Sequence, residues 1–205
     1  MKVLLINGSP HKNGTTFRAL SEVASSLNQN GIETEIITVG DKEVSGCSVC
    51  LACTKLGKCV KDDIVNEIIS KIESSDGVVV GSPVYYASLN GTLKAILDRV
   101  FFAKKSFAYK PAAAVAVARR AGTTATLDIL NKYFMINNMP VISSSYWNMV
   151  FGSNAEQASC DEEGLQTMRT LGKNMAWIIK CIEAGKNNGI DLPEIESKIK
   201  TNFIR

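Results

Sequence analysis

The chain has little of what would assign it to several common classes of protein. Its only histidine is His11, so a zinc site built from several histidines is excluded, and any Cys–His or Ser–His catalysis would have to use that residue. With 15 glycines and 5 prolines among 205 residues, it is neither collagen-like nor low in complexity. Its longest apolar run, residues 112–118, is far shorter than the roughly 18–20 residues that cross a bilayer.

Charge of one sign is also scarce. The formal net charge of +3 is small and is spread along the chain, which argues against nucleic acid or an anionic membrane as a partner. The apolar run within residues 1–6 is too short for the core of a signal peptide. We therefore expect a cytoplasmic protein whose cysteines are reduced, and which binds neither nucleic acid nor membrane.

The apolar residues that are present predict five strands alternating with helices. Three runs, at 2–7, 78–80 and 111–118, are typical of strands buried on both faces. Two runs, at 32–39 and 140–146, are more mixed, as edge strands can be. Helical spacing indicates the following helices: 15–29, 62–72, 91–104, 124–138, 161–184 and a short one near 194–203.

This alternation predicts a three-layer, doubly wound α/β domain with a five-stranded parallel sheet. We place the single domain at residues 1–184, with a cysteine-rich loop inserted at 41–60 and a polar tail at 185–205. In such sheets ligands bind beyond the carboxyl ends of the strands, where the strand order reverses. The candidate ligand-binding loops are 8–16, 41–60, 83–90, 119–124 and 146–152.

The loop after the first strand has the composition of a phosphate-binding turn. Gly8 and Gly14 permit a tight backbone, and the hydroxyls of Ser9, Thr15 and Thr16 can donate hydrogen bonds. The helix that follows presents free N–H groups and the positive end of its dipole. The loop matches neither the P-loop nor the dinucleotide-binding glycine pattern. We interpret it as a cradle for the phosphate of a bound cofactor; the alternative is a plain strand-to-helix turn.

Two further loops could line a flat heteroaromatic ring. Tyr85 and Tyr86 follow the third strand, and the alternative is that one packs in the core while the other is exposed. In the next loop, Gly122 lets the backbone approach a ligand, and Arg119 or Arg120 could place positive charge beside it. Such a charge would stabilise the anionic form of a reduced flavin. The alternative is a solvated arginine pair.

Four of the six cysteines fall in one short loop with the pattern C-x2-C-x2-C-x5-C: Cys47, Cys50, Cys53 and Cys59. This density indicates a metal or an iron–sulfur cluster, and the first three positions match the spacing of bacterial ferredoxin runs. Zinc held by four thiolates and a redox-active thiol loop are the alternatives. We interpret the isolated Cys160 and Cys181 as buried core residues.

Two charged pairs have simpler interpretations. Asp62 or Asp63 precedes an apolar helical stripe, so we expect a helix cap rather than a metal ligand. We expect Asp98 and Arg99 to form an ion pair within their helix or at an interface. Trp147 either covers the edge of a flavin or packs against neighbouring side chains.

Taken together, these motifs resemble a known family. The segments that carry the resemblance are GSP at 8–10, GTT at 14–16, GCSVCLAC at 46–53, GKC at 57–59, DD at 62–63, GSPVYY at 81–86, LDR at 97–99, YWNMV at 146–150 and DEEGLQT at 161–167. Over about residues 1–184, the chain is similar to the flavodoxin-fold NADPH-dependent FMN reductases, and more narrowly to their iron–sulfur flavoprotein branch. The resemblance implies one FMN per subunit, and a homodimer or homotetramer with the flavin near a subunit interface.

The resemblance also implies which residues bind the cofactor. The FMN phosphate would be held by Ser9, His11, Asn13, Thr15 and Thr16. The ring would lie against Pro83, Val84, Tyr85, Tyr86 and the loop that contains Arg119, Arg120 and Gly122. Relatives often carry arginine in place of His11, so the charge offered to the phosphate here depends on the protonation of an imidazole. No residue is assigned as catalytic, because the flavin carries the chemistry and Ser9 beside His11 lacks the third member of a triad.

We therefore predict an FMN-dependent NAD(P)H oxidoreductase. Its flavin would accept hydride and pass electrons to a small-molecule acceptor or a redox protein, directly or through a 4Fe-4S cluster held by the four cysteines. The alternative is a non-catalytic electron carrier of the flavodoxin type. Such carriers are usually strongly acidic, so the net charge of +3 favours the enzyme. A third hypothesis is a zinc-stapled binding module without flavin.

Overall fold

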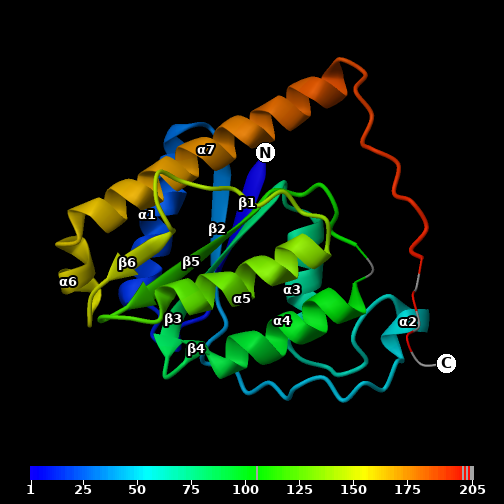
Figure 1. The fold of residues 1–205 in the computed structure, drawn as a ribbon, viewed down its shortest axis with the longest axis horizontal. Helices are drawn as coiled ribbons and strands as arrows, with labels where there is room; N and C mark the ends of the chain where they lie inside the picture. Colours follow the sequence, from blue (N-terminus) through cyan, green and yellow to red (C-terminus); the bar gives the residue numbers. More distant parts are fainter. Residues whose placement is uncertain (105, 200, 202, 204–205) are drawn as a thin grey trace.

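The strands form one twisted sheet with the order β2-β1-β3-β5-β6, in which every neighbouring pair is parallel (Figure 1). In this computed structural model, residues 1–104, 106–199, 201 and 203 are described. A sixth strand, β4, pairs antiparallel with the end of β3. The bounds are β1 Lys2–Asn7, β2 Glu33–Thr38, β3 Gly77–Tyr85, β4 Ser88–Leu89, β5 Ala112–Ala118 and β6 Met149–Phe151. The predicted fold class is confirmed, and β4 is an added hairpin strand too short to show a periodicity.

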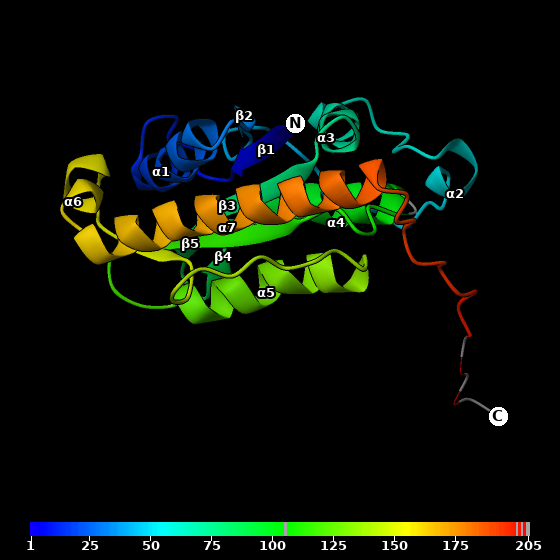
Figure 2. The ribbon, with the colours of Figure 1, turned by 90° about the horizontal axis from the view of Figure 1, so that it is seen from above.

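The helices cover both faces of the sheet, which gives three layers (Figures 1 and 2). Apolar residues of α3, α4 and α5 pack on one face, and those of α1 and α7 on the other. The bounds are α1 Thr15–Gln29, α2 Cys53–Leu56, α3 Ile64–Glu73, α4 Gly91–Ala103, α5 Thr123–Ile136, α6 Ala155–Ser159 and α7 Glu162–Asn187.

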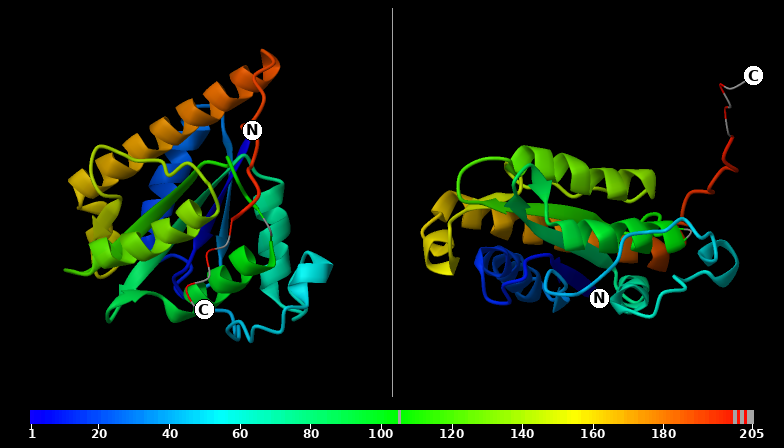
Figure 3. Two further views of the ribbon diagram at one scale, coloured as in Figure 1. Left: turned by 45° about the vertical axis from the view of Figure 1, so that its right-hand side comes forward. Right: turned by 90° about the horizontal axis from the view of Figure 1, so that it is seen from below.

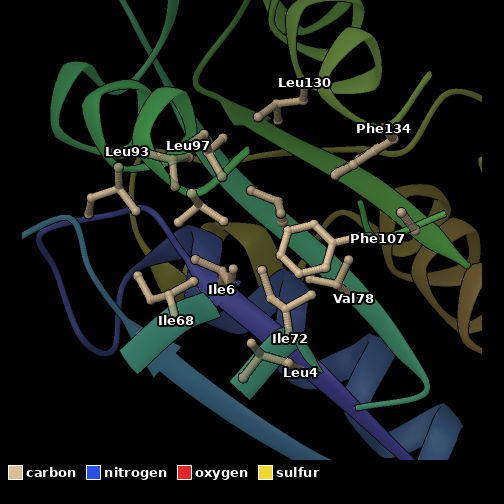
Figure 4. Close-up of a cluster of buried hydrophobic side chains, with 14 of the residues drawn as sticks. Leu4, Ile6, Ile68, Ile72, Val78, Leu93, Leu97, Phe107, Leu130 and Phe134 are labelled. Carbon is tan, nitrogen blue, oxygen red and sulfur yellow. The ribbon is translucent and has the colours of Figure 1, made fainter. Parts of the chain in front are cut away.

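Strand β1 shows how one strand supplies both cores. Its side chains alternate, so Leu4 and Ile6 belong to the cluster beneath α3, α4 and α5, while Val3 and Leu5 belong to the cluster beneath α1 and α7. Figure 4 shows the first cluster, in which Leu4 and Ile6 lie among Ile68, Ile72, Val78, Leu93, Leu97, Phe107, Leu130 and Phe134. Because β1 is buried on both faces, its residues 3–6 are all apolar, as the strand prediction assumed.

The chain reverses direction across the sheet between β1 and β3. It first adds β2 on one side of β1, and then returns to place β3 on the other side. At such a reversal the two connecting loops leave in opposite directions, so the space above the strand ends stays open for a ligand. The reversal therefore places the 8–16 loop beside the loop that follows β3.

The predicted fifth strand is in the wrong place. Within 140–146 the structure has only an isolated bridge between Val141 and Ala112, and the edge strand that pairs with the end of β5 is β6. Val141 and Ile142 suggested a strand, but three serines follow at 143–145, and they provide no apolar side chains to bury. The chain therefore leaves the sheet after Ile142 and rejoins it at Met149.

The last long helix is confirmed, and α7 runs to Asn187. The helix expected near 194–203 is absent from the described residues of that range, which excludes 200 and 202; the described part of the tail leads away from the sheet (Figure 2). Cys160 and Cys181 are exposed, so their interpretation as buried residues is wrong. Among the residues that the structure describes, no helix combines the length and the apolar character needed to cross a membrane.

Candidate functional site

A cleft of about 810 Å³ lies at the carboxyl edge of the sheet, where the loops after β1, β3, β5 and β6 meet. It brings together all the predicted cofactor residues except Tyr86, Arg120 and Gly122. Its lining is Ser9, His11, Lys12, Asn13, Gly14, Thr15, Thr16, Pro83, Val84, Tyr85, Val117, Ala118, Arg119, Gly152, Ser153, Asn154, Ala155 and Glu156. The volume lies within the range of small-molecule and cofactor sites.

The 8–16 loop is held in shape by its own polar side chains. The carboxamide oxygen of Asn7 accepts a hydrogen bond from the Ser9 amide at 3.1 Å, and the Ser9 hydroxyl accepts one from the His11 amide at 3.2 Å. These are the turn-forming contacts that Asn and Ser side chains make with the backbone two residues on. The second contact uses one acceptor lone pair of the Ser9 hydroxyl and leaves its proton to donate to a ligand in the cleft.

The turn after β2 packs against the backbone of the 8–16 loop at residues 8–10. A Cβ atom added to Gly40, which follows β2, would lie 2.3 Å from the Gly8 carbonyl oxygen and 2.6 Å from the Pro10 nitrogen. Only a glycine allows the two backbones to approach this closely. The 8–10 backbone is therefore positioned by a residue that the sequence analysis did not identify.

The start of α1 has the features of an anion-binding site. Gly14 precedes the helix and provides no capping side chain, and the first turn contains no acidic residue. The Thr16 side chain is 1% exposed, yet its hydroxyl has no hydrogen-bond partner. Uncapped helix amides and an unpaired buried hydroxyl together fit a phosphate group, which accepts hydrogen bonds from both.

The opposite wall of the cleft is built from the last residues of β3 and from the loop after β5. Gly122 has φ of 90°, and a Cβ there would lie 2.7 Å from Val84 Cγ1, so glycine lets the start of α5 pack against the end of β3. Pro83, Val84 and Arg119 thus face a common space. Tyr85 is 43% exposed and Tyr86 is fully exposed at the tip of the hairpin, so neither tyrosine is a core residue.

Of the segment 152–156, which follows β6 and lines the cleft, sequence reasoning included only Gly152, the last residue of the candidate loop 146–152, and missed residues 153–156. They were missed because the fifth strand was placed too early. One local signal was available: the Asn154 side chain accepts a hydrogen bond from the Gln157 amide at 2.8 Å and so caps α6. Gly-Ser-Asn after an apolar pair is a typical entry into a helix.

The four clustered cysteines lie elsewhere, around a small cavity of about 20 Å³ whose other walls are mainly apolar: Leu51, Val60, Phe102 and Ala103. Cys47 and Cys50 are exposed and Cys53 is buried. Within the described residues, no three His, Cys, Asp or Glu side chains are gathered closely enough to hold a metal ion. The donors fit a thiolate-bound metal by type and by shared location, but their loop must change shape to bring the sulfurs together.

Arg99 lines this cavity, and its ion pair differs from the predicted one. Its fully buried guanidinium pairs with Asp63, 36 residues away, whereas Asp98 pairs with Lys94; the expected Asp98–Arg99 pair is therefore wrong. Asp63 also caps α3, as predicted, by accepting a hydrogen bond from the Val65 amide. Burial lowers the pKa of Arg99, but hydrogen bonds to Asp63 and to the Cys59 sulfur outweigh it, and the pKa is raised.

The cleft and the cysteine cavity lie at opposite ends of α4. The helix starts just after the β3–β4 hairpin beside the cleft, and its last turn, with Arg99 and Phe102, lines the cavity. A helix of this length, 13 residues, spans roughly 20 Å. Figures 1, 2 and 3 show α6, next to the cleft, and α2, in the cysteine loop, at opposite ends of the molecule.

Comparison with known proteins identifies a family. The model of the NADPH-dependent FMN reductase family matches residues 1–154. An iron–sulfur flavoprotein of Methanocaldococcus jannaschii is 34% identical over 192 residues, which cover 89% of this chain and 100% of that protein. An iron–sulfur flavoprotein of Methanosarcina thermophila is 29% identical, with 91% of this chain and 100% of that protein covered.

Solved structures share the fold at low sequence identity. RosB, described with bound 8-demethyl-8-formylriboflavin-5'-phosphate, has a TM-score of 0.70 at 16% identity and covers 100% of this chain and 94% of its own. The apo form of the NADH:FMN oxidoreductase EMOB has a TM-score of 0.63 at 22% identity, over 86% of this chain and 88% of its own. An archaeal flavodoxin has a TM-score of 0.61 at 13% identity, over 88% of this chain and 99% of its own.

Proposed function

Because the chain belongs to the NADPH-dependent FMN reductase family, in its iron–sulfur flavoprotein branch, we propose that it is an FMN-dependent NAD(P)H oxidoreductase. The observation that carries the proposal is the buried, unpaired hydroxyl of Thr16 beside the uncapped start of α1, in a cleft of cofactor size. A buried hydroxyl without a partner costs stability, and of the buried atoms without a partner in the described residues, the Thr16 hydroxyl is the one that lines the cleft, where a ligand would accept its hydrogen bond.

The residues of the 8–16 loop would bind the FMN phosphate. Ser9 and Thr16 have hydroxyl protons free to donate, and the amides at the start of α1 add donors and a favourable dipole. Thr15 and Asn13 line the same part of the cleft. His11 and Lys12 are exposed at its mouth, where the positive charge of Lys12 would attract the phosphate and the His11 ring could hydrogen bond to it.

The last residues of β3 and the loop after β5 would hold the ring. Pro83 and Val84 offer a partly buried apolar surface, and Tyr85 and Arg119 lie at the edge of the cleft. When bound, FMN accepts a hydride from NAD(P)H and releases electrons in pairs or singly. Arg119 would offset the negative charge that the ring gains on reduction. Arg120 and Gly122 would act indirectly, since Arg120 lies outside the cleft and Gly122 positions the loop against Val84.

Titration of the apoprotein with FMN tests the proposal. We expect saturable binding at one FMN per chain, and rapid bleaching of the flavin absorbance when NADH or NADPH is added without oxygen. An electron carrier of the flavodoxin type would bind FMN but would not be reduced by either nucleotide. Failure to bind FMN would contradict both functions and leave only the fold.

We further propose that Cys47, Cys50, Cys53 and Cys59 hold a 4Fe-4S cluster through which electrons pass to a small acceptor or a redox protein. The support is the shared cavity of the four thiols and the names of the relatives. Zinc remains the alternative for the same donors, since four thiolates suit either.

Replacing Cys50 with alanine is expected to abolish iron binding and leave FMN binding unchanged, because Cys50 lines the cavity and not the cleft. Iron, sulfide and flavin are measured on protein reconstituted anaerobically. The matched control is Cys181→Ala, which removes an exposed thiol from α7 and should retain its iron. Equal iron in both variants would contradict the cysteine assignment.

We also propose that the protein forms a homodimer or homotetramer. Tyr146 and Trp147 are 56% and 59% exposed on the loop before β6, and two large aromatic side chains in this position would gain stability if another subunit buried them. The separation of cleft and cavity along α4 adds a second reason. Within one protomer α4, which is roughly 20 Å long, separates the two sites, and a second copy would provide a shorter route for electrons if its cavity lay beside this cleft.

A further inference from the structure

We propose that Arg99 is a positioning residue for the cysteine cavity: its guanidinium anchors the Cys59 sulfur as the fixed metal ligand and fastens both ends of the cysteine loop. This inference rests on the proposed iron–sulfur cluster. Arg99 would contact the cluster only through Cys59, so it acts by holding a ligand in place and by hydrogen bonding to its sulfur.

The hydrogen bonds of Arg99 account for its complete burial. Its side chain is 1% exposed, and each of its five N–H groups has an acceptor. Two are directed at Asp63, in a bidentate pair of 2.6 and 3.0 Å, and one at the Ser45 carbonyl at 3.2 Å. The other two are directed at Cys59 Sγ, from Nε at 3.3 Å and from Nη2 at 3.1 Å.

A sulfur is an unusual target for two of these donors. The Asp63 pair neutralises the guanidinium but satisfies only two of its five N–H groups, and two of the remaining three are directed at the sulfur. A neutral thiol is a weak acceptor, whereas an anionic sulfur, such as a metal-bound thiolate, accepts strong charge-assisted bonds. The geometry is therefore the one expected around a ligating cysteine.

The backbone of Cys59 is held as firmly as its sulfur. The Asn66 side chain, on α3, accepts a hydrogen bond from the Cys59 amide and donates one to the Cys59 carbonyl, both at 2.9 Å. Cys47 and Cys50, by contrast, are exposed on a segment without regular structure, in which Val49 and Leu51 have positive φ. Cys59 is thus held at its backbone and its sulfur, and Cys53 is buried at the start of α2, so Cys47 and Cys50 are the donors that would have to approach them.

Arg99 also brings the start of the loop to this fixed point. The Ser45 carbonyl that accepts from its Nη1 lies just before Cys47, and Lys61 donates to the Ser45 hydroxyl and to the Gly46 carbonyl, both at 2.8 Å. Both ends of the cysteine loop are therefore fastened next to Cys59. Without Arg99, Cys59 would lose its sulfur contacts, and the loop entrance would keep only its contacts with Lys61.

The proposal has a consequence for redox behaviour. Hydrogen bonds to a ligating sulfur draw charge away from a cluster and raise its reduction potential. Removing the guanidinium should lower the potential of any cluster that still forms. Supporting groups of this kind typically contribute about 10–100-fold to metal affinity.

The test uses the FMN-loaded full chain, reconstituted anaerobically with ferrous iron and sulfide. Arg99→Lys keeps the buried positive charge but removes the planar guanidinium that donates to Asp63, Ser45 and Cys59 at once. The double variant Asp63→Asn with Arg99→Met removes both charges together. Lys94→Met is the matched control, because Lys94 lies on the exposed side of the same helix. Iron affinity, the EPR spectrum and the cluster potential are measured, with FMN content as the test of folding.

We expect both Arg99 variants to retain FMN, to bind iron about 10–100-fold more weakly, and to show a lower cluster potential and an altered EPR spectrum. Lys94→Met should match the unsubstituted protein. Wild-type iron affinity and potential in both Arg99 variants would overturn the inference while leaving the proposed function intact. Loss of FMN together with iron would also overturn it, by assigning Arg99 a general role in the fold. If the unsubstituted chain binds FMN but no iron, the proposed cluster fails and this inference fails with it.

Discussion

Replacing Thr15 and Thr16 together with alanine is expected to weaken FMN binding by about 1–3 kcal/mol, the usual scale for lost hydrogen bonds to a charged group. Both residues line the cleft at the start of α1, and the Thr16 hydroxyl is buried without a partner in the protein. Dissociation constants from flavin fluorescence quenching provide the measurement. Thr170→Ala, in the middle of α7, is the control, because its hydroxyl donates only to the backbone of its own helix.

The single variant Thr16→Val separates binding from folding. Valine keeps the shape of threonine and removes the unpaired hydroxyl, so the apoprotein should be as stable as the unsubstituted protein or more stable, with a gain of up to about 1–3 kcal/mol. FMN affinity should fall at the same time. A loss of apoprotein stability in urea, together with unchanged FMN affinity, would show that the hydroxyl serves the fold and that the phosphate is bound elsewhere.

Replacing Gly40 with alanine is expected to lower both the stability of the protein and its affinity for FMN, because Gly40 packs against the backbone of the 8–16 loop. The new Cβ would lie 2.3 Å from the Gly8 carbonyl oxygen and 2.4 Å from the Ser9 carbonyl carbon, and neither backbone atom can rotate away. Overpacking of this kind typically costs about 1–3 kcal/mol of unfolding free energy. Because the 8–10 backbone must shift, we expect FMN affinity to fall by at least the value of one charge-assisted hydrogen bond, about 1.5–3 kcal/mol.

Gly91→Ala is the matched control for Gly40→Ala. Gly91 begins α4, and a Cβ there would meet no atom within 4 Å, so its stability and FMN affinity should be nearly unchanged. Urea denaturation of the apoprotein and FMN titration measure both quantities. If Gly40→Ala binds FMN as tightly as Gly91→Ala does, the backbone at residues 8–10 does not hold the phosphate.

Several elements could be predicted with accurate bounds because their signals are local. The strand at 2–7 and the helix at 15–29 were predicted with the bounds that the structure shows, since an apolar run between turn residues and a helical spacing of apolar residues each reflect a single element. The edge strand at 149–151 could not be predicted in the same way. Its three residues carry no periodicity, and their pairing depends on β5, more than 30 residues earlier.

In the candidate site, too, the features set by neighbouring residues could be predicted, and those set by contacts between distant residues could not. The composition of the 8–16 loop and the spacing of four cysteines were sufficient to predict a phosphate cradle and a metal-binding loop. The contacts that position them join residues distant in sequence: Gly40 with the 8–10 backbone, and Arg99 with Asp63 and Cys59. Neither pairing has a periodic signal, because each results from the packing of complete elements against one another.

The order of strand and helix, the apolar faces and the chemistry of the first loop follow from the residues alone, because each depends on near neighbours and on a short repeat. The position of the cysteine loop depends on the folded molecule. That loop begins at the carboxyl edge of the sheet, where the strand order predicted a role beside the cleft, but it ends at the last turn of α4, at the other end of the protomer. The length of α4 sets this separation, and the buried ion pair of Arg99 with Asp63 holds the end of the loop beside the last turns of that helix, so both depend on contacts between residues distant in sequence.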